Sequence, residues 1–243
     1  LPQGGSVRAE ERDRALAELS HTLTRIDVEV YEACGRDPHV PILGGGEPAC
    51  RIGVFGRDPG RHEVVHGRPF VGAGGQKVRG VLHEVLHGAP LPDFEASLEV
   101  GRHVFWANTV PYKPIGNKAW GKREQRRFQP LITDLLVNGW RGRDVITLGL
   151  QAFHWFGLAD REVARALDVH WKREDRFETS VEVPLVAPDG QSARFRLHPL
   201  RHPAPLHAPR PKRIPGRLAA RLAALDLTID SWRLPGGEAP AAV

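Results

Sequence analysis

Apolar positions along the chain recur with two different periods, and the places where the period changes predict its elements. Residues 8–33 hold apolar side chains at helical spacing and predict one amphipathic helix that covers a face of a sheet. Short apolar runs predict buried strands at 51–56, 102–108 and 144–149. Helical spacing returns at 72–87, 121–138, 151–156, 161–167 and 211–225.

The alternation of strands with helices sets the predicted fold class. Residues 177–186 and 193–200 alternate around a turn-rich connection and predict a hairpin whose second arm reaches the core. Strands joined through helices favour a parallel sheet covered on both faces. We therefore expect a three-layer α/β/α protein with a central, mostly parallel, four-stranded sheet. The chain is interpreted as one domain, with an N-terminal helix and loop at 1–50, a core at 51–226 and a tail at 227–243 that frays at its end.

Ligands of such sheets bind beyond the carboxyl ends of the strands. The segments that follow Gly56, Ala107 and Leu200 are the most unusual in the chain, since they combine glycine, proline and polar side chains. They are expected to converge on one crevice.

Composition narrows the class of protein. Hydrophobic residues make up 41% and charged residues 26%, which is typical of a globular chain, and no apolar run approaches the ~20 residues of a membrane helix. The polar start predicts no secretory signal, and we expect a cytoplasmic, nucleoid-associated protein without a membrane partner. Two cysteines, Cys34 and Cys50, are too few for a disulfide framework or a four-thiolate metal site.

The net charge of the chain indicates a candidate binding partner. The formal net charge is +5, which favours approach to a polyanion such as DNA. Basic residues concentrate at 118–127 and 201–217. Solvated helix faces or loops are the alternative interpretation of both stretches.

The chemistry-bearing side chains stand in these strand-end segments. The run GRDPG at 56–60 places Asp58 after the first strand, Glu63 and the run GRPFVG at 67–72 follow, and Asn108 ends the second strand. The last arm leads into HPLRHPAPL at 198–206, which contains His202. An acid, an aromatic face, an amide and an imidazole would share one pocket with a basic rim.

From about residue 51 to 210, this ordered set resembles the uracil-DNA glycosylase superfamily. GRDPG is similar to the water-activating loop of these enzymes, GRPFVGAGG to a segment of the family-four enzymes, and HPAPL to a loop of the family-one enzymes, with Ala204 in place of serine. The resemblance implies a glycosylase that flips a damaged base out of DNA and leaves an abasic site.

Physical chemistry gives each residue a role beside that resemblance. Breaking an N-glycosidic bond develops positive charge on the sugar and negative charge on the departing base. Asp58 is then the general base or electrostatic partner of the water, and His202 stabilises the departing base. Phe70 stacks on the base, Asn108 reads its edge, and Leu206 is the candidate wedge in the duplex. The remaining predictions assign Gly56, Gly60 and Glu63 to the base pocket, and Arg201, Pro203, Arg210, Lys212 and Arg213 to the DNA backbone.

Each residue also has a structural interpretation. Asp58 before proline is typical of a turn or cap, Phe70 of a core, and Asn108 of a strand-end cap. His202 is one of 12 histidines, and Leu206 can pack on its own loop.

Departures from the family patterns leave three hypotheses open. The chain lacks the four cysteines that hold the iron–sulfur cluster of family-four enzymes, so we expect no metal and no cofactor. Gly60 stands where family-one enzymes carry the tyrosine that excludes thymine. The first hypothesis is a monomeric, monofunctional uracil-DNA glycosylase without a covalent imine, since no lysine lies in the motifs. The second is a non-catalytic DNA- or nucleobase-binding module, and the third a glycosylase for hypoxanthine or a 5-modified uracil.

Overall fold

The computed structural model describes residues 3–203 and 213–235. Its centre is a five-stranded sheet in the order β2-β1-β3-β5-β4. The strands are β1 (Ile52–Gly56), β2 (Phe105–Asn108), β3 (Asp144–Leu148), β4 (Val181–Val186) and β5 (Ser192–Leu200). Strands β2, β1, β3 and β5 are parallel, and β4 pairs with β5 in the antiparallel sense.

The predicted fold class is confirmed, but the expected number of four strands was too low. The first arm of the hairpin, β4, joins the sheet as an edge strand. Its side chains alternate, with Val183 and Leu185 buried and Glu182 and Pro184 exposed. Proline is tolerated here because an edge strand needs no ladder hydrogen bond on its outer side.

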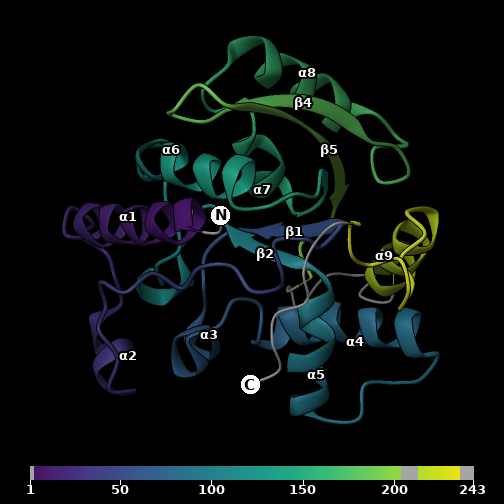
Figure 1. Ribbon diagram of the computed structural model, residues 1–243, viewed down its shortest axis with the longest axis horizontal. Helices are drawn as coiled ribbons and strands as arrows, with labels where there is room; N and C mark the ends of the chain where they lie inside the picture. Colours follow the sequence, from purple (N-terminus) through teal and green to yellow (C-terminus); the bar gives the residue numbers. More distant parts are fainter. Residues whose placement is uncertain (1–2, 204–212, 236–243) are drawn as a thin grey trace.

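Helices cover both faces of the sheet (Figure 1). One side holds α1 (Gln3–Ser20), α6 (Lys122–Asn138) and α7 (Leu150–Trp155), with α8 (Arg161–Lys172) packed on β4. The other side holds α4 (Ala73–His87), α5 (Phe94–Val100) and α9 (Arg213–Ala224). The shorter helices are α2 (Val28–Glu32) and α3 (Arg61–His66), and two 3-10 turns span Gly101–His103 and Ile115–Asn117.

The alternation of side chains along β1 divides the core into two parts. Phe55 packs into the layer of α1, α6 and α7, whereas Ile52 and Val54 pack under α4 and α9. Gly53 belongs to the first face, and a Cβ atom there would lie 2.8 Å from the ring of Trp140. The absence of a side chain at Gly53 therefore lets a buried tryptophan lie against the strand.

The N-terminal helix differs from the prediction for residues 8–33. It ends at Ser20, whose hydroxyl donates to the carbonyl of Ala17, and a separate short helix, α2, begins at Val28. Between them, Ile26 forms a bridge with Pro114. Helix α1 packs against α6 rather than directly on the sheet, so it adds to the helical layer.

Part of the predicted tail is fixed to the core. The Arg51 guanidinium donates to the carbonyls of Leu225, Asp226 and Ser231 at 3.0–3.3 Å, and Cys50 forms a bridge with Arg233. The predicted fraying concerns residues 236–243, which lie outside the described residues. Within the described ranges, no helix is both long enough and apolar enough to cross a membrane.

Candidate active site

The carboxyl ends of β1, β2, β3 and β5 meet at one cavity of about 420 Å³. Register explains the convergence, because Gly56 of β1 lies beside Asn108 of β2, and Leu148 of β3 beside Leu200 of β5. The expected crevice is therefore present. Of the predicted site residues, eight line it, and they come from three separate segments of the chain: Gly56, Asp58, Gly60, Glu63, Phe70, Asn108, His202 and Pro203.

Asp58 follows β1, and its side chain is only 2% exposed. Within the described residues its carboxylate accepts two long hydrogen bonds of 3.4 Å, from the Thr109 hydroxyl and the Trp120 backbone N–H. The Nε atom of Arg57 lies 4.0 Å from Oδ2. Burial outweighs these contacts and raises the pKa of Asp58 to about 7. A carboxyl group with this pKa exchanges protons near neutrality, as a general base must.

Phe70 is held in an unusual backbone conformation. Its φ of 57° lies in the left-handed region, which non-glycine residues rarely adopt. The buried Arg79 fixes this turn, since its guanidinium donates to the carbonyls of Pro69 at 3.2 Å and Phe70 at 2.8 Å. The Phe70 ring packs 4.9 Å from the Trp106 ring and against Gly56, where a Cβ atom would lie 2.6 Å from it. Glycine at 56 thus makes room for an aromatic wall of the cavity.

Asn108 and His202 add polar groups to the same cavity. Asn108 is 6% exposed, and its amide forms no hydrogen bond within the described part of the chain. A buried amide has donors and an acceptor to satisfy, which fits a site for a polar ligand. His202 lies against Gly149, where a Cβ atom would be 3.2 Å from that of His202.

Glu63 joins the two loops that bracket the cavity. One carboxylate oxygen accepts from the N–H of Gly60 at 3.0 Å and the other from the N–H of Gly72 at 2.7 Å. A Cβ atom at Gly60 would lie 2.9 Å from Glu63 Oε2. The carboxylate of Glu63 therefore occupies the space toward which a side chain at position 60 would point.

The predicted phosphate-binding residues are placed only in part. Arg201 is absent from the cavity lining, and its guanidinium lies 5.2 Å from the ring centroid of Phe177. Arg176 and Arg217 stack on the same ring at 4.7 and 4.9 Å, which creates a cationic cluster around Phe177. The other predicted positions, Leu206, Arg210, Lys212 and the side chain of Arg213, lie outside the described residues.

Sequence reasoning missed the groups that surround Asp58. Arg57 stood inside a quoted motif but was given no role, and its guanidinium donates to the Asn117 carbonyl at 3.4 Å. Thr109 directly follows a predicted residue, which was a usable signal. Trp120 acts through its backbone N–H, so its side-chain identity gave no indication of this contact.

Neither cysteine is part of this site. Cys50 is buried, its thiol lies 3.2 Å from the Arg102 carbonyl, and burial raises its pKa to about 12. Among the described residues, no group of three or more His, Cys, Asp or Glu side chains is arranged to hold a metal ion.

The arrangement combines a proton acceptor, a flat apolar wall and an unsatisfied amide. These are the features needed to hold a planar, hydrogen-bonding group beside a carboxylate. A family comparison gives the same result, because residues 43–225, more than half of the chain, match the model of the Uracil DNA glycosylase superfamily. The resemblance inferred from the motifs is thereby confirmed. The chain belongs to the uracil DNA glycosylase superfamily, which makes it a DNA-repair hydrolase acting on damaged bases in DNA.

Proposed function

We propose that this protein is a monofunctional uracil-DNA glycosylase. The observation that carries the proposal is the convergence of Asp58, Phe70, Asn108 and His202 on one cavity at the carboxyl edge of the sheet. An extruded uracil stacks on Phe70, and the Asn108 amide donates to one of its carbonyls and accepts from its imide N–H. Phe70 and Asn108 line the same cavity as Asp58, whose carboxylate is 2% exposed.

Hydrolysis then divides between two polar side chains. Asp58 accepts a proton from the attacking water and stabilises positive charge on the sugar. His202 stabilises the uracil anion as the N-glycosidic bond breaks. The water oxygen ends on the sugar, and the proton held by Asp58 passes to the uracil anion, so the products are an abasic site and free uracil.

The substrate range is expected to depend on Gly60 and Glu63. A carboxylate, rather than an aromatic ring, fills the space beside Gly60. This difference favours the alternative that 5-substituted uracils are also accepted. Hypoxanthine and binding without cleavage are the remaining alternatives. Gly60 is the reason to test the first, and the Ala204 that replaces the family serine is the reason to test the second.

A panel of oligonucleotides tests the proposal. Each strand carries one uracil, 5-substituted uracil, hypoxanthine or thymine, in single strands and opposite guanine or adenine, and the released base is measured by chromatography. We expect release of uracil, and release of thymine as well would show that Gly60 and Glu63 do not exclude a 5-methyl group. Release of hypoxanthine alone would show that the substrate is hypoxanthine and not uracil. Tight binding without any release would identify a binding module.

A chemical trap tests the monofunctional assignment separately. Borohydride captures an enzyme that attacks the sugar through an amine, because it reduces the imine to a stable cross-link. With water as the nucleophile, no protein–DNA cross-link is expected. A cross-linked band would show that an amine of this protein attacks the sugar.

A further inference from the structure

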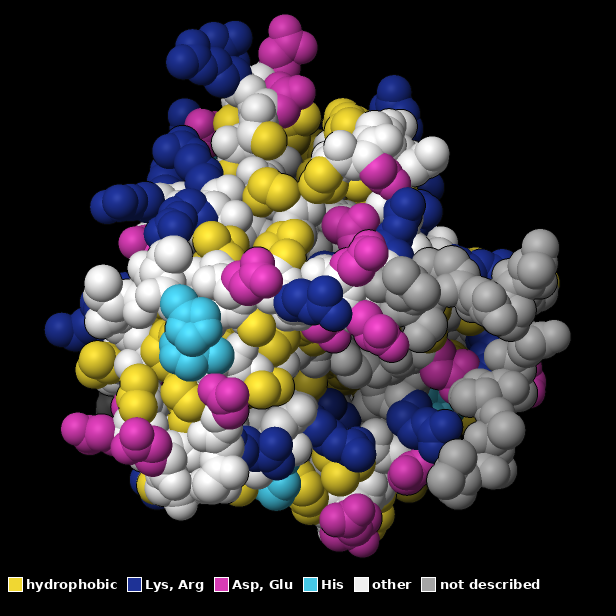
Figure 2. Space-filling model, turned by 60° about the vertical axis from the view of Figure 1, so that its left-hand side comes forward, with side chains coloured by type: hydrophobic (Ala, Val, Ile, Leu, Met, Phe, Trp, Pro, Cys, Tyr) yellow, Lys and Arg dark blue, Asp and Glu magenta, His cyan; other side chains and the backbone are white. Residues whose placement is uncertain are grey.

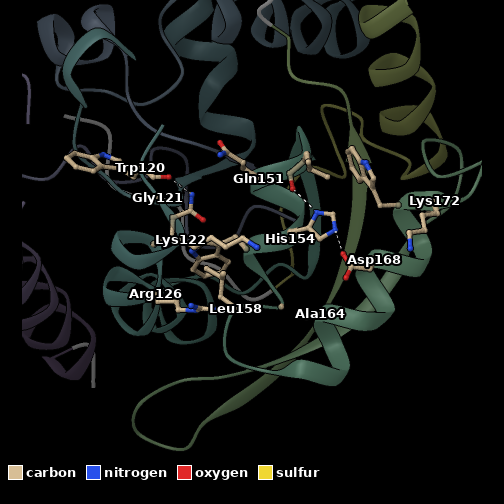
Figure 3. Close-up of a pocket in the computed structure, with 15 residues that line it drawn as sticks. Trp120, Gly121, Lys122, Arg126, Gln151, His154, Leu158, Ala164, Asp168 and Lys172 are labelled. Carbon is tan, nitrogen blue, oxygen red and sulfur yellow. Dashed lines mark hydrogen bonds and ion pairs between the residues drawn. The ribbon is translucent and has the colours of Figure 1, made fainter. Parts of the chain in front are cut away.

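A second cavity of about 440 Å³ lies between the N-terminal ends of α6 and α7 and the face of α8. We refer to it as the α6–α8 groove. Figure 3 shows Lys122 and Arg126 of α6 on one side, Lys172 of α8 on the other, and His154 of α7 between them. Of its lining residues, Trp120 contacts the proposed catalytic group, because its backbone N–H donates to Asp58.

The rim of the α6–α8 groove is basic. Lys122, Arg126 and Lys172 are exposed cations, and Asp168 is the one carboxylate in the lining. Asp168 is engaged by His154, whose Nε2 atom lies 3.0 Å from its Oδ1. The N-terminus of α6 at Gly121 adds its partial positive charge, and the carboxylate of Glu124 in the first turn lies beside it. An anionic occupant fits this charge distribution.

The floor of the groove is apolar and aromatic. Trp155 and Leu158 lie in the lining with the half-exposed Leu150, and Trp171 is partly exposed. The indole N–H of Trp155 is buried and has no acceptor within the described residues. A flat ligand with oxygen acceptors and a phosphate matches such a surface, and a nucleotide has all of these.

A short path connects the groove to the active site. The backbone N–H of Trp120 donates to Asp58, and its carbonyl accepts from the Gln125 side chain at 3.0 Å. Gln125 and Gly121 line the groove. The groove thus begins at the segment that contacts the carboxylate of Asp58.

On the face drawn in Figure 2, charge alone does not mark a DNA-binding surface. On the face in Figure 2, Lys and Arg side chains stand among Asp and Glu side chains rather than in one block. Local combinations of cations with apolar surface therefore decide where a strand binds.

We propose that the α6–α8 groove binds a nucleotide of the single DNA strand that flanks the extruded base. The phosphate lies among Lys122, Arg126 and Lys172, and the base lies on the apolar floor. This inference rests on the proposed function, because it takes the DNA substrate as the occupant. It adds an accessory subsite and a preference for substrates whose flank is single-stranded or easily unpaired.

A binding experiment with a matched control tests the subsite. Lys122→Glu with Lys172→Glu reverses two charges in the groove, and Arg123→Glu with Arg165→Glu reverses two exposed charges on the same helices outside it. Fluorescence anisotropy of a labelled oligothymidylate gives the affinity without any base release. The double variant in the groove, here called the groove pair, is expected to bind the oligothymidylate at least about tenfold more weakly than the double variant outside it, the control pair. The slope of its log affinity against log salt concentration is expected to be smaller in magnitude by about 1.4. Equal losses in both pairs would overturn the subsite.

A kinetic experiment separates this inference from the proposed function. We compare kcat/KM for uracil release from a trinucleotide and from a strand with long flanks. The groove pair is expected to lose about tenfold with the long strand and nothing with the trinucleotide. Equal loss on both substrates would contradict the subsite while leaving the glycosylase intact. No release from any enzyme would count against the proposed function, and the anisotropy comparison would still decide the subsite.

Discussion

At the scale of single residues, the proposed chemistry depends on the carboxyl group of Asp58 and its neighbours. Burial raises its pKa to about 7, and the nearby Arg57 charge lowers it, so the balance between them sets the fraction of ionised carboxylate at neutral pH. We therefore treat Arg57 as a positioning residue. It lies 4.0 Å from the carboxylate and does not need to touch the substrate.

Removal of the Arg57 charge is expected to move the pH dependence of base release. In Arg57→Gln the carboxyl loses its closest cation, so the acid limb of the kcat/KM profile shifts to higher pH. The control is Arg61→Gln, an exposed arginine of the same cavity without an ion pair to Asp58. Profiles that shift equally in both variants would remove the role given to Arg57.

Burial of Asp58 also has a cost in stability. The folded-state pKa of Asp58 is about 7, above the ordinary aspartate value of 3.8. Its contribution to stability is therefore fully present below about pH 4 and is lost as the pH rises through 7. Asp58→Asn is thus expected to be more stable than the wild type at pH 8, by about 2 to 4 kcal/mol, and to lose this advantage near pH 4. Urea unfolding at the two pH values measures the difference, and an equal advantage at both would refute it.

Glycines at close contacts determine how the elements pack. Gly53 of β1 lies against the Trp140 ring, whereas Gly80 in the middle of α4 has no atom within 4 Å of an added Cβ. Both are glycines inside regular elements. An added methyl group would meet the Trp140 ring at Gly53 and open space at Gly80.

Alanine at these two positions should have opposite effects on the free energy of unfolding. Gly53→Ala is expected to destabilise by about 1 to 3 kcal/mol, because the buried tryptophan must shift. Gly80→Ala is expected to stabilise by about 0.5 to 1 kcal/mol, since alanine has the higher helix propensity. Thermal unfolding of both variants tests this pair, and a loss in Gly80→Ala would show a contact that the structure lacks.

The elements that the sequence predicted best are those with a long, regular pattern. Helices α4 and α6 and the strands β1, β2 and β3 lie within two or three residues of the expected bounds. Helices α3 and α5 were missed, although the Asp93 cap of α5, which accepts from the Ala96 N–H at 2.8 Å, was a readable signal. The break after Ser20 depends on contacts with Pro114 and α6, which are remote in sequence.

At the scale of the whole molecule, parallel topology brings distant motifs together. Asp58, Asn108 and His202 could be predicted as neighbours because each follows a strand of one parallel sheet. The contacts of Arg201 with Phe177 and of the tail with Arg51 could not be predicted. They join segments that no common hydrophobic pattern in the sequence links. The tail beyond residue 226 is therefore a structural part of the core as far as residue 235.

Arg51 is the residue that tests this role of the tail. Arg51→Ala removes three hydrogen bonds to carbonyls of residues 225, 226 and 231, and is expected to destabilise by about 1 to 3 kcal/mol. Arg165→Ala, an exposed arginine of α8, is the control and should change stability by less than about 0.5 kcal/mol. A wild-type melting curve for Arg51→Ala would mean that these three hydrogen bonds contribute nothing to stability.

The proposed glycosylase mechanism depends most on Asp58 as the proton acceptor in base release. The decisive measurement is the single-turnover rate of uracil release between pH 5.5 and 8.5, for the wild type and for Asp58→Asn. We predict a wild-type rate that rises through a pKa of about 7 to a plateau, and a folded Asp58→Asn protein slower by about 10² to 10⁴-fold with no such rise. A folded variant that keeps the wild-type rate and pH profile would contradict the account.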